Sequence, residues 1–527
     1  MKKFNYYILF PLALGLLYII CSYFWCNAVP RCYIVDETDH VCFLYVFLQG
    51  LADHNWRHVL APDPRFHYPF FGYWALSLGS FFRPNSCNIW LPSAFIILGL
   101  LALFYLSAEK SREKSSVIIA AFLFVSPVFG GSMRAVMADN VFNLLVTAAV
   151  IFLILSDHAN IKKWAVLSGA AMALGLLCKI GVFLYLLVPV LLAVFFEEKD
   201  SELRFSLPKG ERLKNVFYLL LIPAAIFVIY LCIVPEYFRA FLEAFDKNAP
   251  IPNNPLGESW NDFLWMLLGW TYGWGLLGAA LILIGGSLYY RIRSGASLKI
   301  WAQSACTVLF PIIAIPFLRT FPQTHYTLPI LSFSIIWLAV CYEDCCRIFK
   351  TVFFTLFLMA LAAVLAVLWN VYPFFHSINY GENQIACCIG PLRIPKYSLW
   401  RTSRTAYGLH IPYDDKMTEV YEIVNLMRAE FEKSPVPDVK GAWYPFVVVG
   451  RLDYPMPLDV PALDTYMSVF GLFCKLKTLS VYDSPDYKYC RFFIAKEGDE
   501  TPAAFKWTKI RDLDYKGLKV CVYKRDE

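Results

Sequence analysis

The sequence predicts a mostly α-helical protein that crosses a membrane several times and ends in a small α/β domain. Three observations lead to this fold class. Hydrophobic residues make up 58% of the 527 residues and charged residues only 17%, too little charge for the surface of a soluble chain of this length. Apolar runs long enough to cross a bilayer recur as far as about Phe375. After residue 372 the apolar runs shorten and charged residues become more frequent.

The apolar runs define about eleven expected transmembrane helices. Their approximate bounds are 6–28, 87–107, 116–133, 141–157, 164–178, 181–196, 215–235, 262–290, 301–318, 326–344 and 351–371. The joints that are rich in Lys and Arg fall on alternate sides of these spans. The positive-inside rule then places those joints and the N-terminus in the cytoplasm.

This pattern divides the chain into two predicted domains. Residues 1–371 form a transmembrane domain with an acidic outer loop, 29–86, and residues 372–527 form an extracytoplasmic α/β domain. In the second domain, residues 417–433 have the apolar spacing of an amphipathic helix. Residues 446–449, 491–495 and 518–523 have the composition of buried strands. This domain contains no phosphate-binding glycine loop and no nucleophile elbow, so we expect the chemistry to lie in the membrane domain.

A short acidic cluster directly after the first apolar run is the main candidate for catalysis. It contains Asp36, Glu37, Asp39 and His40. Ionisable groups beside or inside a membrane are costly unless they face water and bind something, so they are functional candidates by default. An isolated acidic pair would instead be interpreted as part of a solvated loop.

More polar residues fall on the same predicted outer side. They occur in an aromatic segment, at an outer helix boundary, inside an apolar run and where the ninth expected span meets the tenth. These residues are His67, Tyr68, Arg134, Asp139, Lys179, Arg319, His325 and Tyr326. Each charge taken alone fits a side chain that snorkels at a helix end, but their collection on one face indicates a site. The neighbouring aromatic residues are Phe66, Tyr68, Tyr73 and Trp74. We expect them to form chiefly an interfacial belt, and the alternative is that they stack on a sugar or line a path for a lipid chain.

The order of these motifs resembles that of the GT-C membrane glycosyltransferases, which use polyprenyl-phosphate sugars. The sequence has an Asp-Glu pair after the first span, an aromatic-Pro…Gly-Tyr-Trp segment (66–74) and an Arg…Asp-Asn turn (134–140). A Lys-Ile-Gly break (179–181) and a His-Tyr…Pro helix start (325–329) follow. The similarity covers roughly residues 1–345 and is greatest to bacterial aminoarabinose transferases of lipid A and to protein O-mannosyltransferases. It implies a multi-pass protein of a bacterial cell membrane.

The resemblance assigns roles to individual residues. Asp36 matches the family's first acid, which deprotonates or orients the acceptor, and Glu37 matches the second acid, which supports the loop. Asp39 and the pair His67-Tyr68 stand where aminoarabinose transferases have an Arg and a Glu-Lys pair. Two cations that would contact the lipid phosphate are therefore absent.

The donor phosphate then needs positive charge from elsewhere. The candidate side chains are Lys179, Arg134 and Arg319, and the remaining candidates for donor binding are Asp139, His67, Tyr68, His325 and Tyr326. The alternative is a divalent cation held by Asp36, Asp139 and His67. We favour side-chain cations, because two carboxylates and one imidazole provide few ligands for a divalent cation. No other cofactor is predicted.

The resemblance also implies the reaction and its partners. A sugar passes from a polyprenyl-phosphate donor to a lipid, glycan or protein acceptor, and a single attack with one base inverts the anomeric carbon. Membrane lipids are further partners, and nucleic acid is not. Two other classes remain open. A transporter or flippase would show interrupted helices in corresponding positions of two halves, and we find no internal repeat. A catalytically silent GT-C-like sensor would have lost the phosphate cations.

Overall fold

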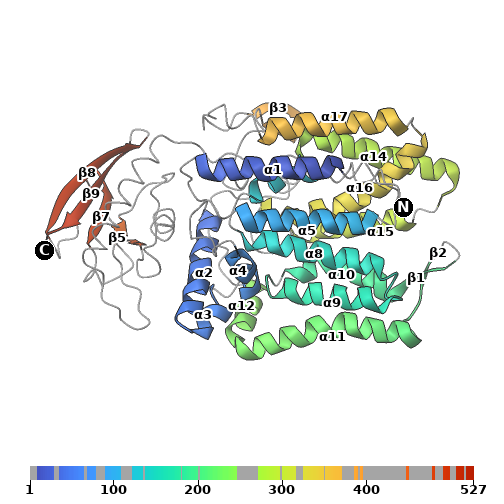
Figure 1. Ribbon diagram of the computed structural model, residues 1–527, viewed down its shortest axis with the longest axis horizontal. Coiled ribbons are helices and arrows are strands. Elements are labelled where there is room, and N and C mark those ends of the chain that lie inside the picture. The colour runs from blue at the N-terminus through green and yellow to red at the C-terminus, as the bar shows by residue number, and fades with distance from the viewer. Residues whose placement is uncertain are drawn as a thin grey trace.

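The computed structural model describes most of the membrane domain and the strands that follow it. The described residues are 9–28, 35–63, 68–78, 90–108, 122–133, 137–179, 181–199, 202–245, 271–296, 299–315, 324–348, 351–370, 385–389, 392–395, 447–449, 478–480, 491–498, 506–515 and 518–526. Long helices run side by side in a bundle, and shorter helices lie across one of its ends (Figure 1).

The prediction of a polytopic helical membrane protein is confirmed. Ten of the expected spans coincide with long helices: α1 (Leu9–Ala28), α5 (Trp90–Ala108), α8 (Ala138–Leu155), α9 (Lys162–Leu176), α10 (Val182–Phe195), α11 (Gly210–Ile233), α14 (Gly273–Ser294), α15 (Lys299–Ala314), α16 (Leu328–Ile348) and α17 (Thr351–Asn370). The expected span 116–133 is described only from residue 122 and contains the short helix α7 (Pro127–Ser132).

Four helices in the described part of the chain are both long enough and apolar enough to cross a bilayer. They cover Ala138–Leu155, Gly210–Ile233, Leu276–Ser294 and Leu328–Ile348. The first and last of these are 78% buried inside the protein, whereas Gly210–Ile233 is only 22% buried. Helices α8 and α16 therefore form the centre of the bundle, and α11 lies at its edge, where lipid covers its apolar side chains.

Small residues bring the helices close together. A Cβ at Gly169 of α9 would lie 2.9 Å from the carbonyl oxygen of Leu219 on α11, so only glycine allows this approach. A Cβ at Gly72 would lie 2.8 Å from the Cβ of Ala138 at the start of α8. Close approach at small residues is the usual way in which membrane helices pack, because lipid supplies no hydrophobic drive between them.

The described residues of the expected outer segment 29–86 form three helices, which we did not predict from the sequence. These are α2 (Val35–Ala52), α3 (Trp56–Leu60) and α4 (Phe70–Ser77). Helix α2 buries Phe43 and Phe47 one turn apart, and Asn55 caps α3 by accepting a hydrogen bond from the amide of His58. Helices α2 and α3 cross the end of the bundle (Figure 1).

The opposite end of the bundle carries the basic joints. A hairpin of β1 (Phe196–Lys199) and β2 (Glu202–Phe205), which the sequence did not predict, lies there (Figure 1). The buried Arg212 donates hydrogen bonds to the carbonyl oxygens of His158, Ala193, Val194 and Phe196. These bonds satisfy carbonyls at the end of α10 and fix the joint between α8 and α9.

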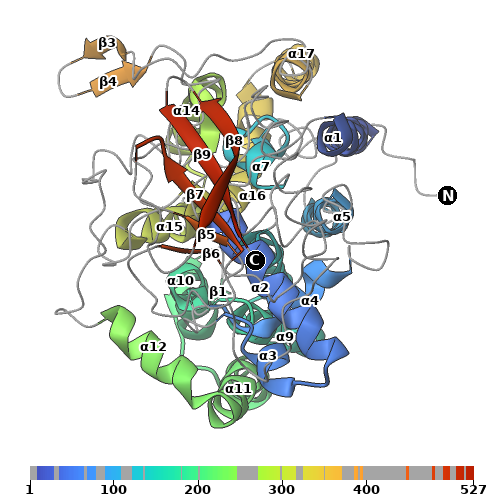
Figure 2. The same ribbon diagram turned by 90° about the vertical axis from the view of Figure 1, so that its left-hand side faces the viewer.

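The C-terminal region contains a five-stranded mixed sheet with the order β6-β5-β7-β9-β8. Its strands are β5 (Val447–Val449), β6 (Thr478–Ser480), β7 (Phe492–Lys496), β8 (Trp507–Tyr515) and β9 (Leu518–Arg525), and a separate hairpin is formed by β3 (Ile385–Ile389) and β4 (Leu392–Pro395). Strands β5, β7 and β9 confirm the three predicted strands. The expected helix 417–433 lies outside the described residues. The sheet lies beyond the end of the bundle that carries α2 (Figures 1 and 2).

Candidate active site at the end of the bundle

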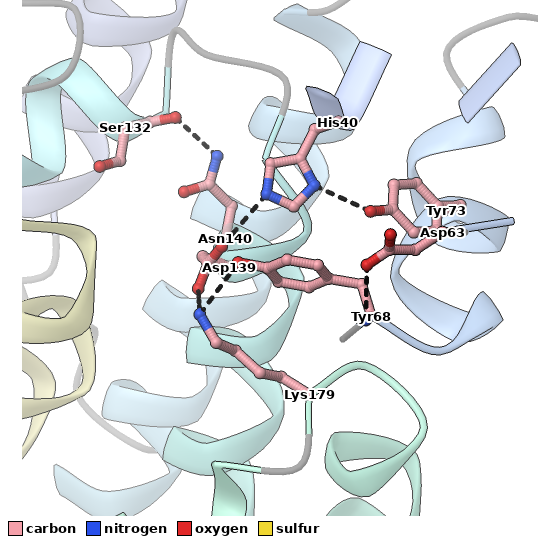
Figure 3. A network of polar contacts seen from close by, with 8 residues as sticks. All are labelled: His40, Asp63, Tyr68, Tyr73, Ser132, Asp139, Asn140 and Lys179. Carbon is pink, nitrogen blue, oxygen red and sulfur yellow. Dashed lines mark hydrogen bonds and ion pairs between the residues drawn. The ribbon is translucent and has the colours of Figure 1, made fainter. Parts of the chain in front are cut away.

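The centre of the candidate site is Asp139, in the first turn of α8. Met137, which precedes the helix, has extended backbone, and the side chain of Asp139 is only 3% exposed. A carboxylate in this position is stabilised by the unpaired amides and the positive dipole at the start of a helix. Asn140 donates a hydrogen bond to the carbonyl oxygen of Ser132 at 2.6 Å, which ties the start of α8 to α7 (Figure 3).

Lys179 supplies the positive charge of the site. It lies in the turn after α9, where its amide bonds to the carbonyl of Gly175, and its Nζ lies 2.6 Å from Oδ1 of Asp139. The same Nζ donates to the hydroxyl of Tyr68 at 3.3 Å. It also lies 5.0 Å from the ring centroid of Tyr68 and 4.2 Å from that of Tyr326. The ammonium is therefore held by one carboxylate and by two aromatic rings.

A second, fully buried chain of contacts supports Asp139 from the other side (Figure 3). Nδ1 of His40 lies 3.0 Å from the hydroxyl of Tyr73, and Nε2 of His40 lies 3.5 Å from Oδ2 of Asp139. The imidazole also meets the ring of Tyr68 edge-on, with centroids 4.6 Å apart. Helices α2, α4 and α8 thus meet at one histidine.

Two hydrogen bonds orient the tyrosines around the lysine. The buried Asp63 accepts a hydrogen bond from the amide of Tyr68 at 3.2 Å, which fixes the chain just before α4. On the other side, the hydroxyl of Tyr185 donates to the carbonyl of Tyr326 in the 3-10 helix η7 (Thr324–Thr327) at 2.8 Å. Five segments of the chain therefore converge on Lys179 and Asp139.

Four of the residues predicted from the sequence lie together in this site: Tyr68, Asp139, Lys179 and Tyr326. Asp36 and Glu37 lie in the first turn of α2, one turn before His40, but their side chains are outside the described part. His325 lies in η7, and its side chain is also outside that part. His67, Arg134 and Arg319 are not among the described residues. Their assigned roles stay predictions.

The sequence placed His40 in the acidic cluster without giving it a separate role, and it assigned no site role to Asp63 or Asn140. One signal was available, since His40 follows Asp36 by four residues and α-helical spacing places both on one face. The expectation that Tyr73 belongs to an interfacial belt is wrong: its side chain is fully buried and bonded to His40. Trp74, which is 48% exposed, does fit a belt.

The divalent cation that we considered finds little support in the described side chains. Of the expected ligands Asp36, Asp139 and His67, only Asp139 has a described side chain, and Lys179 lies against one of its oxygens at 2.6 Å. An ammonium at that distance already supplies the charge that a cation would bring. Among the described residues, no group of three or more His, Cys, Asp or Glu side chains is close enough to hold a metal ion.

Comparison with known proteins agrees with this architecture. Residues 67–229 match the family model described as dolichyl-phosphate-mannose-protein mannosyltransferase. The structure is similar to that of ArnT from Cupriavidus metallidurans bound to undecaprenyl phosphate, with a TM-score of 0.61, 14% identity and coverage of 98% of this chain and 97% of that chain. The apo state of the same protein gives a TM-score of 0.57 at the same identity and coverage. No curated protein matches the sequence.

The chain is therefore an integral membrane protein with the fold of the GT-C glycosyltransferases, as the ordered motifs predicted. At 14% identity the structural similarity establishes the fold but not the reaction. The reaction has to be inferred from the residues of the site.

Proposed function

We propose that the protein transfers a sugar from a polyprenyl-phosphate donor to a lipid, glycan or protein acceptor at the end of the bundle that carries α2. The observation that carries this proposal is the position of Lys179. Its ammonium lies among Asp139, Tyr68 and Tyr326 where five segments meet, at one end of a membrane bundle. A partly buried cation at a membrane boundary is costly to keep and suits the phosphate of a lipid.

The fold supports the same substrate class. ArnT, whose fold matches nearly the whole chain, was crystallised with undecaprenyl phosphate. Polyprenyl phosphates carry a charged head on a long apolar tail. Such a molecule can place its phosphate at the polar end of a bundle and its tail along the apolar helices.

The reaction needs one base and one site for the leaving phosphate. The acceptor attacks the anomeric carbon and gives its proton to Asp36. The bond between that carbon and the phosphate oxygen breaks, and its electron pair goes to the polyprenyl phosphate. Lys179 stabilises the negative charge that grows on this leaving group. One displacement without an enzyme nucleophile inverts the anomeric carbon.

The missing family cations make Lys179 more important in this chain. Tyr68 stands where a lysine is expected, and its hydroxyl accepts a hydrogen bond from Lys179. A tyrosine hydroxyl can also donate a hydrogen bond to a phosphate oxygen, but it brings no charge. We therefore assign the phosphate charge to Lys179, with Arg134 and Arg319 as the further candidates.

The division into residues 1–371 and 372–527 and the orientation in the membrane remain part of this proposal. Lys162, Lys209, Arg293 and Arg347 belong to helix ends or joints at the end opposite to the site. The positive-inside rule assigns that end to the cytoplasm. Transfer then takes place on the extracytoplasmic face.

The direct test is release of undecaprenyl phosphate by the purified protein in proteoliposomes. A panel of undecaprenyl-phosphate sugars would be offered with a membrane-lipid extract, and the freed lipid phosphate measured by mass spectrometry. We expect release with at least one sugar, and its loss in Lys179→Ala. A flippase would move the donor across the bilayer without cleaving it, and a silent sensor would bind it without cleavage. Either result would contradict the proposal.

A further inference from the structure

His40 contacts both polar partners of Lys179. Its Nε2 lies 3.5 Å from Oδ2 of Asp139, and its ring lies against the ring of Tyr68, whose hydroxyl accepts from Lys179. The imidazole is only 2% exposed. It is therefore too deeply buried to meet a substrate directly, and it acts through its neighbours.

Asp139 and Tyr73 together set the tautomer of His40. A neutral imidazole has one N–H donor and one acceptor nitrogen. A lone pair of Nε2 turned toward the Asp139 carboxylate would be repulsive, so the carboxylate favours the tautomer with its hydrogen on Nε2. In that tautomer the buried Tyr73 hydroxyl, which can donate or accept, donates to Nδ1 and stabilises it.

The two oxygens of Asp139 therefore face two different groups. Lys179 lies at Oδ1 at 2.6 Å, and Nε2 of His40 lies 3.5 Å from Oδ2, at an ion-pair distance rather than in a hydrogen bond. His40 is held within α2 by packing on Tyr68 and Tyr73, whereas Lys179 lies in a turn and carries its charge on a flexible stem. Of the two groups, Lys179 is the one that can change its partner.

We propose that His40 is a positioning residue that holds the Asp139 carboxylate while Lys179 moves from Asp139 to the donor phosphate. This inference rests on the proposed function. A buried carboxylate that loses the cation at one of its oxygens is destabilised, and that penalty would keep Lys179 on Asp139. The imidazole at Oδ2 reduces the penalty, so the lysine becomes available to the phosphate. Tyr73 contributes by stabilising the tautomer.

Two substitutions at His40 separate this role from simple packing. In His40→Gln the amide nitrogen can take the place of Nε2 and still donate to Asp139. In His40→Asn the shorter amide can take the place of Nδ1 and meet only Tyr73. His58→Gln, on α3 and outside the network, is the matched control for replacing a histidine.

The measurement is the Kd for undecaprenyl phosphate, with the full-length protein in nanodiscs. Loss of a close polar contact with a charged group predicts a ~10–100-fold weaker Kd for His40→Asn. His40→Gln should lose much less than His40→Asn, and His58→Gln should match the wild type. In an Asp139→Asn background, the difference between Gln and Asn at position 40 should disappear, because the carboxylate that needs support is gone. A purely structural histidine would not give that pattern.

Tyr73→Phe gives a second test that keeps the packing of the buried ring. It removes the hydroxyl that stabilises this tautomer by donating to Nδ1, so we expect a Kd between those of the wild type and His40→Asn. Equal Kd values for His40→Gln and His40→Asn, or a wild-type Kd for Tyr73→Phe, would overturn the role of His40 while leaving the proposed function intact. A wild-type protein that does not bind undecaprenyl phosphate would overturn the proposed function and this inference with it.

Discussion

Two ion pairs, each with a buried carboxylate and a partly buried cation, lie near opposite ends of the bundle, and they are built differently. At the basic end, Arg291 on α14 donates from Nε to Oδ2 of Asp344 on α16 at 2.5 Å, and Ser287 donates to the same oxygen at 2.6 Å. At the other end, Lys179 and Asp139 come from a turn and from the first turn of a helix. One pair joins two helices through a planar guanidinium, and the other holds a point charge on a flexible stem.

This difference separates a structural ion pair from a functional one. Arg291 and Asp344 lie within regular helices, and a guanidinium in a two-point contact has no freedom to exchange partners. Lys179 already shares its ammonium among Asp139, Tyr68 and Tyr326. We expect changes at the basic end to alter stability, and changes at the site end to alter binding and turnover.

The largest expected contrast is all-or-none and concerns the side of the membrane on which each end lies. In a background without native cysteines, an impermeant thiol reagent on intact cells should label Lys506→Cys and leave Arg293→Cys unlabelled. Both positions are exposed. Burial raises the pKa of the native Cys521 thiol, so this cysteine should react slowly even where it is retained. Labelling of Arg293→Cys alone would reverse the orientation and move the site to the cytoplasm.

The next largest effect is expected at Asp36. Asp36→Asn should reduce turnover by ~10²–10⁴-fold, because a general base contributes that much to such a reaction. Glu37→Gln should be milder if Glu37 only supports the start of α2. Release of undecaprenyl phosphate measures both, and thermal melting in detergent controls for folding. Unchanged turnover in Asp36→Asn would remove the catalytic role that we assign to it.

The comparison of the two ion pairs predicts opposite effects of similar substitutions. Arg291→Met leaves a buried carboxylate without its cation, so the free energy of unfolding should fall by roughly 3–5 kcal/mol with little change in donor KM. Lys179→Met should cost less stability, because His40 still faces Asp139, and should raise donor KM ~10–100-fold. Melting curves and donor KM for both variants test this. Equal losses of stability with an unchanged KM would show that both pairs are structural.

The smallest expected effect is that of a chelator. If Lys179 carries the phosphate charge, excess EDTA should change turnover by less than about twofold, since divalent-cation chemistry is then not required. Lys179→Arg provides the matching control, because a guanidinium changes the geometry of the contact without removing the charge. Turnover that stops with chelator and returns with Mg²⁺ or Mn²⁺ would favour the alternative set of Asp36, Asp139 and His67.

The transmembrane helices could be predicted almost entirely from local sequence. Each bilayer crossing needs about 20 apolar residues, and that requirement is visible in any window of the chain. Local composition also predicted the strands β5, β7 and β9. It did not identify α2, although Phe43 and Phe47 have helical spacing. It also missed the β1–β2 hairpin within a joint that is rich in charge.

For the site, the sequence by itself determined which residues are unusual, and only the tertiary structure decided what they do together. Asp139, Lys179, Tyr68 and Tyr326 stand out because charged or polar groups beside a bilayer are costly wherever they occur. Lys179 meets Asp139 across 40 positions and Tyr68 across 111, and His40 meets Tyr73 across 33. Such pairings depend on how helices cross and on which glycines let them approach, as Gly72 does against Ala138. Hydropathy depends on neighbours in the chain, whereas the partners of a side chain depend on neighbours in space. The contacts of His40 with Tyr73 and Asp139 were therefore visible only in the fold.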